Sequence, residues 1–318
     1  MLTDPSCYHA AVAALLRAVD PDADPFLVLG SNAATAVRLL PDGTPSFADP
    51  LEPLTETLAR RGYQLAQHEL RTTTDWQKAL VALETGQTIA VAADPFFLKY
   101  YWVSYQRSHV LHAVVLTGYD PVTDTVRLLD PGEVVFFDDR VQLSALEPAM
   151  YSADHGQVWF ELTPGERMTV TAGEYRALAE NMAGAGSTWI SGTEFLRTLA
   201  GQLDDQLASV HRQVQGRAGP GEVSEWLPLG LWWYHHTLRW LAKYIGAHHA
   251  HHTDRAGLLE SVDRASRDVL VVRNLIMRLS VMPTGTSRAR TFRGQLDTRL
   301  ASALRDLETA SAAIGGSA

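Results

Sequence analysis

The chain of 318 residues contains a single cysteine, so no disulfide can form within it, as is typical of proteins in a reducing compartment. No apolar run approaches the roughly 18 residues that a membrane-spanning helix requires. The N-terminus lacks the basic and apolar regions of a secretory signal. These absences predict a cytoplasmic protein without a membrane span.

Positive charge is scarce in the first half of the chain. Residues 1–163 contain 10 Lys and Arg against 21 Asp and Glu, whereas residues 164–318 contain 17 against 15. An acidic surface repels the phosphates of nucleic acids and attracts cationic small molecules. We therefore expect no nucleic-acid partner, and a positively charged small molecule would suit the first half.

The first half mixes the periodicities of helices and strands. Apolar residues every three or four positions predict helices, and runs rich in β-branched residues predict strands. Residues 20–50 contain several prolines and are expected to be irregular. The expected helices cover residues 7–19, 51–61 and 74–85, and the expected strands cover residues 63–70, 88–93, 134–137 and 158–162.

A β-hairpin is predicted between these elements. His112 opens a first strand that ends at Tyr119, Asp120 and Pro121 begin a turn, and Asp130 closes the second strand. Antiparallel pairing brings the start of one strand beside the end of the next. The hairpin can therefore place a carboxylate beside an imidazole, which fixes the tautomer of a general base.

The second half changes to the helical period alone. Leucines recur at three or four positions near Phe195–Val214 and Leu296–Leu307, and two further helical segments cover residues 229–252 and 255–282. The fold class is therefore expected to be α+β, with a first domain of helices and strands over residues 1–163 and an all-α helical bundle over residues 164–318.

Cys7, His112 and Asp130 together supply the residue types for acyl transfer through a thiol. This chemistry needs a thiolate, a base that ionises it and a group that orients the base. Cys7 lies in the first turn of a predicted helix, where the helix dipole favours the thiolate. An inert buried thiol is the alternative. His9 and His109 compete with His112 as the base, and the hairpin favours His112.

The stretch TGQTIAVAADPFFLKYYWVSYQRSHVLHAVVLTGYD, followed by VRLLDP, resembles the N-terminal domain of the butirosin-biosynthesis acyltransferase family. That family has the fold of papain-like cysteine proteases. The shared features are the aromatic loop after Asp94, the His112 strand, the closing Asp130-Pro131 and an early Cys7 followed by a helix. The resemblance covers roughly residues 1–162 and implies a papain-like catalytic domain.

The resemblance implies a function in natural-product and antibiotic biosynthesis. Its members take an acyl group from the phosphopantetheine thioester of an acyl or peptidyl carrier protein and pass it to a small-molecule amine, without a cofactor on the enzyme. Cys7 would be the nucleophile, His112 the base and Asp130 the orienting group. Related peptidases place an oxyanion-stabilising Gln about six residues before the Cys, where this chain has Met1. The expected donors are then backbone N–H groups at the helix start or a distant side chain.

Two other function classes remain open. A cysteine peptidase or amidase would use the same three residues, with water instead of an amine as acceptor. A papain-like scaffold without catalysis would only bind a carrier protein or small molecule. The sequence leaves the oligomeric state open, with a homodimer as one option.

Several side chains outside the Cys–His–Asp set are candidates for binding. The aromatic run Phe96–Trp102 either lines a substrate pocket or caps the core, so Tyr100 and Tyr101 are candidate substrate contacts. Asp94 either contacts an amine substrate or initiates a turn. Nine arginines between Arg264 and Arg305 form either a solvated helix face or a dock for an acidic carrier protein.

No metal site is expected in this chain. The histidine-rich HHAHH segment at residues 248–252 places His248 and His252 one helical turn apart, a spacing that can chelate a metal. No nearby acid or cysteine completes a ligand set, so a solvated helix end is the favoured interpretation of the segment.

Overall fold

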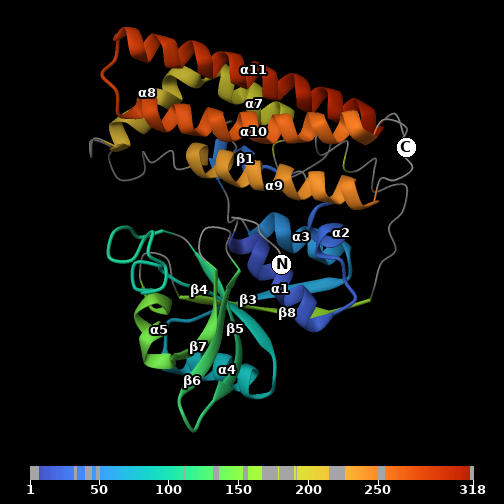
Figure 1. The fold of residues 1–318 in the computed structure, drawn as a ribbon, viewed down its shortest axis with the longest axis vertical. Coiled ribbons are helices and arrows are strands. Elements are labelled where there is room, and N and C mark those ends of the chain that lie inside the picture. The colour runs from blue at the N-terminus through green and yellow to red at the C-terminus, as the bar shows by residue number, and fades with distance from the viewer. Residues whose placement is uncertain are drawn as a thin grey trace. The chain divides into compact units, whose positions relative to one another are not determined.

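The structure is a computed structural model, and it describes residues 7–31, 34–39, 45–47, 51–110, 112–131, 136–152, 157–166, 178, 190, 192–214, 226–248 and 255–315. Contacts between Cα atoms divide the chain into two compact units (Figure 1). The first comprises Met1–Val28 and Thr55–Met168, and the second comprises Leu29–Leu54 and Thr169–Ala318. The fold is α+β, with an antiparallel sheet in the first unit and a helical region in the second.

An antiparallel sheet of six strands forms the centre of the first unit (Figure 1). Its strand order is β3-β8-β4-β5-β6-β7. The register pairs Val115 with Leu129, so the start of β5 lies beside the end of β6, as the hairpin prediction requires. The strands are β3 (Tyr63–Glu69), β4 (Thr88–Ala92), β5 (Ala113–Asp120), β6 (Thr125–Pro131), β7 (Phe136–Gln142) and β8 (Val158–Pro164).

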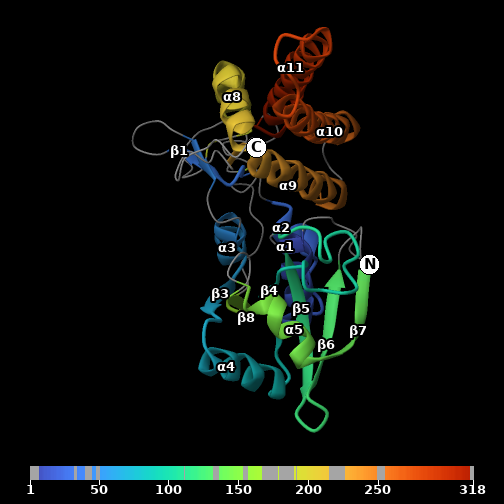
Figure 2. The same cartoon turned by 90° about the vertical axis from the view of Figure 1, so that its left-hand side faces the viewer.

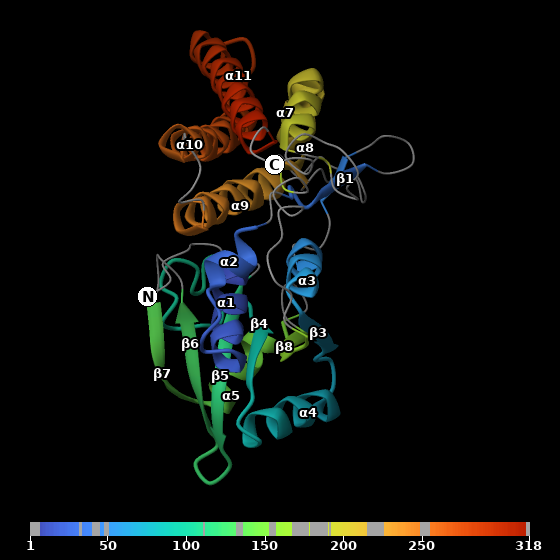
Figure 3. The same ribbon diagram turned by 90° about the vertical axis from the view of Figure 1, so that its right-hand side faces the viewer.

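Helices cover both faces of this sheet. The helix α1 (Cys7–Val19) packs on one face, and Tyr8 makes an edge contact with the ring of Phe160 on β8. The helices α4 (Thr73–Glu84) and α5 (Leu143–Met150) lie on the opposite face (Figures 2 and 3). Because side chains alternate between the faces of a strand, Ile89 and Val91 point into the core beneath α4 and α5.

The segment expected to be irregular contains secondary structure of its own. It includes α2 (Pro25–Leu29) and a two-stranded sheet of β1 (Val37–Leu39) and β2 (Pro45–Phe47), followed by α3 (Leu51–Arg60). The hydroxyl of Thr35 donates to the carbonyl of Ile190, and the Ile190 amide donates to Val37. These bonds explain why Leu29–Leu54 belongs to the second unit. The sequence predicts one domain boundary, after residue 163. In the structure, the last segment of the first unit ends at Met168.

Apart from β1 and β2, the described elements of the second unit are helices. Ion pairs join Arg264 to Asp306 and Arg299 to Asp268, so α10 and α11 run antiparallel. In the described residues, no helix has both the length and the hydropathy that a membrane crossing needs. The helices are α7 (Gly192–Gly201), α8 (Leu203–Val214), α9 (Trp226–His248), α10 (Arg255–Ser280) and α11 (Ser287–Gly315) (Figure 1).

Candidate active site

Cys7 is the first residue of α1, and its side chain is half-buried. The helix is anchored beneath it, because Ala10, Ala11 and Leu15 are buried against the sheet. The first backbone N–H groups of a helix have no partner within the helix, and the dipole there favours negative charge. The thiol therefore lies at a helix start that suits both a thiolate and an oxyanion.

His112 and Asp130 form a buried pair at the open end of the β5–β6 hairpin. His112 immediately precedes β5, and its carbonyl accepts a hydrogen bond from the amide of Ala93, the residue that follows β4. Its Nε2 lies 2.7 Å from Oδ2 of Asp130, and both residues are buried, at 4% and 0% exposure. The sheet register thus produces the imidazole–carboxylate contact that the sequence predicts.

His112 also forms a hydrogen bond with Cys7. Since Asp130 binds Nε2, the nitrogen left for the thiol is Nδ1. Burial alone would lower the pKa of His112, but its hydrogen bonds with Asp130 and Cys7, and the charges of both, raise that pKa to about 10. The imidazole is then protonated at neutral pH, and a positive ring beside Sγ stabilises a thiolate.

Two tyrosines of the aromatic loop, Tyr100 and Tyr101, contact the His112–Asp130 pair. The hydroxyl of Tyr100 donates to Oδ2 of Asp130 at 3.2 Å, and its ring stacks on Phe137 at 4.2 Å. The ring of Tyr101 lies 4.6 Å from that of His112. Burial and the charge of Asp130 raise the pKa of Tyr100. Burial, followed by the charges of Asp130 and Cys7, raises that of Tyr101 to about 12, so both phenols stay protonated.

Asp94, the third predicted substrate contact, is buried and has protein partners for both carboxylate oxygens. The Phe96 amide donates to Oδ1, which is the geometry of a turn-forming aspartate. His109 Nδ1 lies 2.6 Å from Oδ2, and the Ser152 hydroxyl donates to the same oxygen. Burial would raise the pKa of Asp94, but these hydrogen bonds outweigh it and lower the pKa. Contact between Asp94 and a substrate stays a prediction.

The structure assigns His109 and His112, two of the three candidate histidines, to different carboxylates. His109 lies with Asp94 and stacks on the ring of Phe96 at 4.2 Å, while His112 lies with Asp130 and Cys7. Sequence reasoning missed the Asp94–His109 pair because the two residues are separated by a loop of irregular backbone. The position of Asp94 directly after a buried strand could have indicated the pair, because a buried aspartate needs a hydrogen-bond donor nearby.

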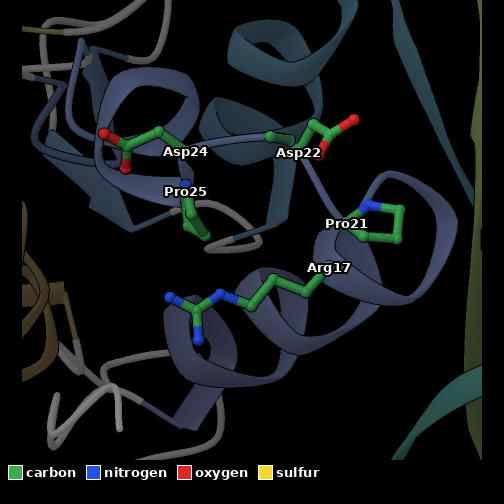
Figure 4. A pocket seen from close by; sticks show the side chains of 6 residues that line it. Arg17, Pro21, Asp22, Asp24 and Pro25 are labelled. Atoms are coloured by element: carbon green, nitrogen blue, oxygen red, sulfur yellow. The ribbon is translucent and has the colours of Figure 1, made fainter.

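A hollow of about 490 Å³ lies at the opposite end of α1. Figure 4 shows Arg17, Asp24 and Pro25 around it. Arg17 belongs to the last turn of the helix that Cys7 begins, and none of Cys7, His112 and Asp130 lines this hollow. It is therefore separate from the candidate active site.

Metal ligation has no support among the residues whose side chains are described, because no three His, Cys, Asp or Glu side chains cluster there. The side chains of the HHAHH segment lie outside that set.

The candidate site therefore consists of Cys7, His112 and Asp130, with Tyr100 and Tyr101 around them. Such a set can ionise a thiol, move a proton between the thiol and a bound group, and hold the imidazole in one orientation. No protein-family model matches the chain, and a search of curated proteins finds no similar sequence.

Proposed function

We propose that the protein is a cysteine acyltransferase with a papain-like first unit, which moves an acyl group from a carrier-protein thioester to an amine. The observation that carries the proposal is that one buried imidazole, His112, binds the Cys7 thiol and the Asp130 carboxylate at once. Nucleophilic thiols in proteins are activated by this arrangement. A protonated histidine beside Cys7 favours a reactive thiolate over an inert buried thiol.

The first step transfers the acyl group to Cys7. The thiolate attacks the thioester carbonyl, and the backbone N–H groups at the start of α1 face the developing oxyanion. The bond between the acyl carbon and the carrier sulfur breaks. His112 gives its proton to the departing sulfur, which leaves as the thiol of the phosphopantetheine arm, and the imidazole becomes neutral.

The second step transfers the acyl group to the amine. The amine nitrogen attacks the carbonyl of the acyl-enzyme while His112 takes a proton from that nitrogen. The bond between the acyl carbon and Sγ breaks, and the amide leaves. Cys7 is again a thiolate beside a protonated His112, so no proton is gained or lost by the enzyme over the cycle.

Asp130 and Tyr100 have supporting roles in this scheme. The carboxylate holds Nε2 of His112 and stabilises the positive ring, as the third member of a catalytic triad does. The Tyr100 hydroxyl fixes the carboxylate by donating to the same oxygen. Tyr101 covers the imidazole and limits the access of water.

The choice of donor and acceptor rests on the resemblance to the butirosin-biosynthesis acyltransferase family in the aromatic loop, the His112 strand and the closing Asp130-Pro131. A thioester is more reactive than a peptide, so weaker oxyanion stabilisation suffices for transfer. The excess of acidic residues in 1–163 also favours an amine as acceptor.

The products of the reaction test this proposal. The enzyme would be incubated with S-acyl-N-acetylcysteamine thioesters, which copy the end of the phosphopantetheine arm, and with a panel of amines. We expect amide as the main product. His112→Ala should lower the rate by at least about a hundredfold, the usual loss for a general acid–base residue. His109→Ala, a matched change at the neighbouring histidine–aspartate pair, should lower it far less.

Free acid with every amine tried would favour the cysteine hydrolase instead. Equal losses in His109→Ala and His112→Ala would contradict the assignment of the base.

A further inference from the structure

The loop over residues 95–110, which follows β4, contains neither helix nor strand, but hydrogen bonds order its backbone. The Gln106 amide donates to the carbonyl of Phe96 at 2.9 Å and so joins two distant parts of the loop. Ser104 is 4% exposed, and its amide donates to the carbonyl of Tyr101. The side chains that this loop presents to solvent therefore project from a defined backbone.

The loop brings an exposed apolar surface next to the candidate active site. The ring of Tyr101 lies 4.6 Å from that of His112. The two residues that follow Tyr101, Trp102 and Val103, are 63% and 38% exposed. Tryptophan is enriched among the residues that contribute most to the binding of partner proteins. An exposed tryptophan one position from a residue of the site is thus suited to contact a partner of the reaction.

The same loop carries positive charge in an acidic half of the chain. Residues 95–119 are the longest stretch of the first half without Asp or Glu. They include Lys99 and Arg107, both exposed, and neither forms an ion pair or a side-chain hydrogen bond within the described part of the chain. Asp94, the acid just before the stretch, is buried and bound by His109. It therefore offers no surface charge against the two cations.

Lys99 and Arg107 belong to the same part of the loop. The side chains of Lys99 and Gln106 line one cavity, and Arg107 is the next residue after Gln106. Several exposed cations elsewhere in the first unit are, in contrast, neutralised by acids. These ion pairs are Arg71–Glu69, Lys78–Asp75 and Arg127–Asp138. The loop thus presents two uncompensated positive charges and is complementary to an acidic partner.

Charge distinguishes between the two substrates of the proposed reaction. An amine acceptor is a cation at neutral pH, so Lys99 and Arg107 would repel it. The donor has the opposite sign, because carrier proteins are acidic and a phosphodiester joins the phosphopantetheine arm to them. The arm is long and flexible, so a carrier protein can bind at the surface while its thioester reaches Cys7.

We infer that loop 95–110 is the surface on which the donor carrier protein docks, with Lys99 and Arg107 binding its acidic face and Trp102 an apolar part of that face. The inference rests on the proposed function, because it locates the donor of that reaction. Long-range attraction between opposite charges raises the rate of association and is screened by salt.

The test compares two acetyl donors. One is the acyl carrier protein of bacterial fatty-acid synthesis with an acetylated phosphopantetheine arm, and the other is S-acetyl-N-acetylcysteamine, which is uncharged. The rate constant for acylation of Cys7 is followed by intact-protein mass spectrometry. In the wild type, the carrier protein should react at least about tenfold faster at equal concentration, and salt should slow this donor but not the small one.

Charge reversal tests the two cations directly. The double variant Lys99→Glu with Arg107→Glu should acylate at least about tenfold more slowly from the carrier protein, because two attractions become repulsions. Its rate with S-acetyl-N-acetylcysteamine should stay within about twofold of the wild type, since this donor has no charge. Arg267→Glu, at an exposed cation on α10, is the matched control and should leave both rates unchanged.

Three outcomes would overturn the inference. They are equal rates from the two donors in the wild type, an unchanged rate from the carrier protein in the double variant, and an equal loss in Arg267→Glu, which would move the dock to the second unit. In each of these cases an acyl-enzyme still forms, so the proposed function remains intact. No acyl-enzyme from either donor in the wild type would instead reject the proposed function itself.

Discussion

His112 has two partners of different character, the carboxylate of Asp130 and the thiol of Cys7. Its burial opposes a positive charge, and the two hydrogen bonds and negative charges favour one. The second effect is larger, so the imidazole keeps its proton well above neutral pH. A protonated histidine that is buried and bound to a cysteine has a direct consequence for the pH dependence of the reaction.

The pH profile of acylation follows from the raised pKa of His112. The folded pKa of about 10 exceeds the usual 6.5, so the ring stays positive across neutral pH and loses its proton only as pH rises through about 10. We expect kcat/KM for a thioester to fall on the alkaline side near pH 10. Measurement of kcat/KM for the thioester at a series of pH values from about 5 to about 11 would test this. An alkaline limb near pH 6.5 would contradict the contacts of His112, and His112→Gln should lack the limb.

Substitutions of Asp130 and Tyr100 test how much the orientation of the His112 ring contributes to the rate. Asp130→Asn should lower kcat by about 10²- to 10⁴-fold, because the ring loses its charged partner and its preferred tautomer. Tyr100→Phe removes one hydrogen bond, worth about 0.5–1.5 kcal/mol, and should lower the rate only about two- to tenfold. Tyr105→Phe, in the same loop, is the matched control. Steady-state kinetics of the three variants would test this order, and a larger loss from Tyr100→Phe than from Asp130→Asn would contradict it.

At the scale of elements, sequence periodicity predicted the parts that hold the site. The predicted helix 7–19 and α1 have the same bounds, and the predicted strands are present as β3, β4, β5, β6 and β8 within one or two residues. Apart from β3, in which only Tyr63 is buried, these elements are strongly apolar on the face that they bury, so their pattern is clear. Cys7, His112 and Asp130 lie at or next to the ends of these elements, so their places in the fold follow from the same pattern.

Other elements could not be predicted correctly from the sequence, for physical reasons. The strand β7 was expected over residues 134–137, of which 134 and 135 lie outside the described residues. Its continuation to Gln142 was not predicted, because this edge strand is mostly exposed and has little apolar pattern. The helix α5 was not predicted: it contains Pro148, and its N-cap residue Gln142 makes no side-chain capping bond. Both elements contribute side chains to a cavity of about 510 Å³ that Tyr100 also lines.

The helix α4 offers a test of local stability. Thr72 caps it, and a capping box links the Thr72 hydroxyl and the Asp75 amide in one direction and the Asp75 carboxylate and the Thr72 amide in the other. Thr72→Ala should lower the free energy of unfolding by about 1 kcal/mol. Thr74→Ala, at an exposed position in the first turn, should change it by less than about 0.5 kcal/mol. Urea unfolding followed by circular dichroism would measure both, and equal effects would contradict the capping role.

At the scale of the whole molecule, contacts between distant segments could not be predicted. Residues 29–54 join the second unit through hydrogen bonds of Thr35 and Val37 with Ile190, about 155 positions away in the chain. No local pattern encodes such a pairing. The Asp94–His109–Ser152 group has the same origin, since Ser152 reaches Asp94 from 58 residues away.

Because the chain has a single cysteine, Cys7 is the only thiol that can become acylated, and the mass of the intact protein shows whether it is. Intact-protein mass spectrometry after mixing with S-acyl-N-acetylcysteamine thioesters should show the wild type gaining one acyl group on Cys7 and losing it when an accepted amine is added. Cys7→Ala should gain nothing under the same conditions, and His112→Ala should gain the group far more slowly. Amide formation by Cys7→Ala at the wild-type rate, without any acylated protein, would contradict the acyl-enzyme and indicate direct attack of the amine on the bound thioester.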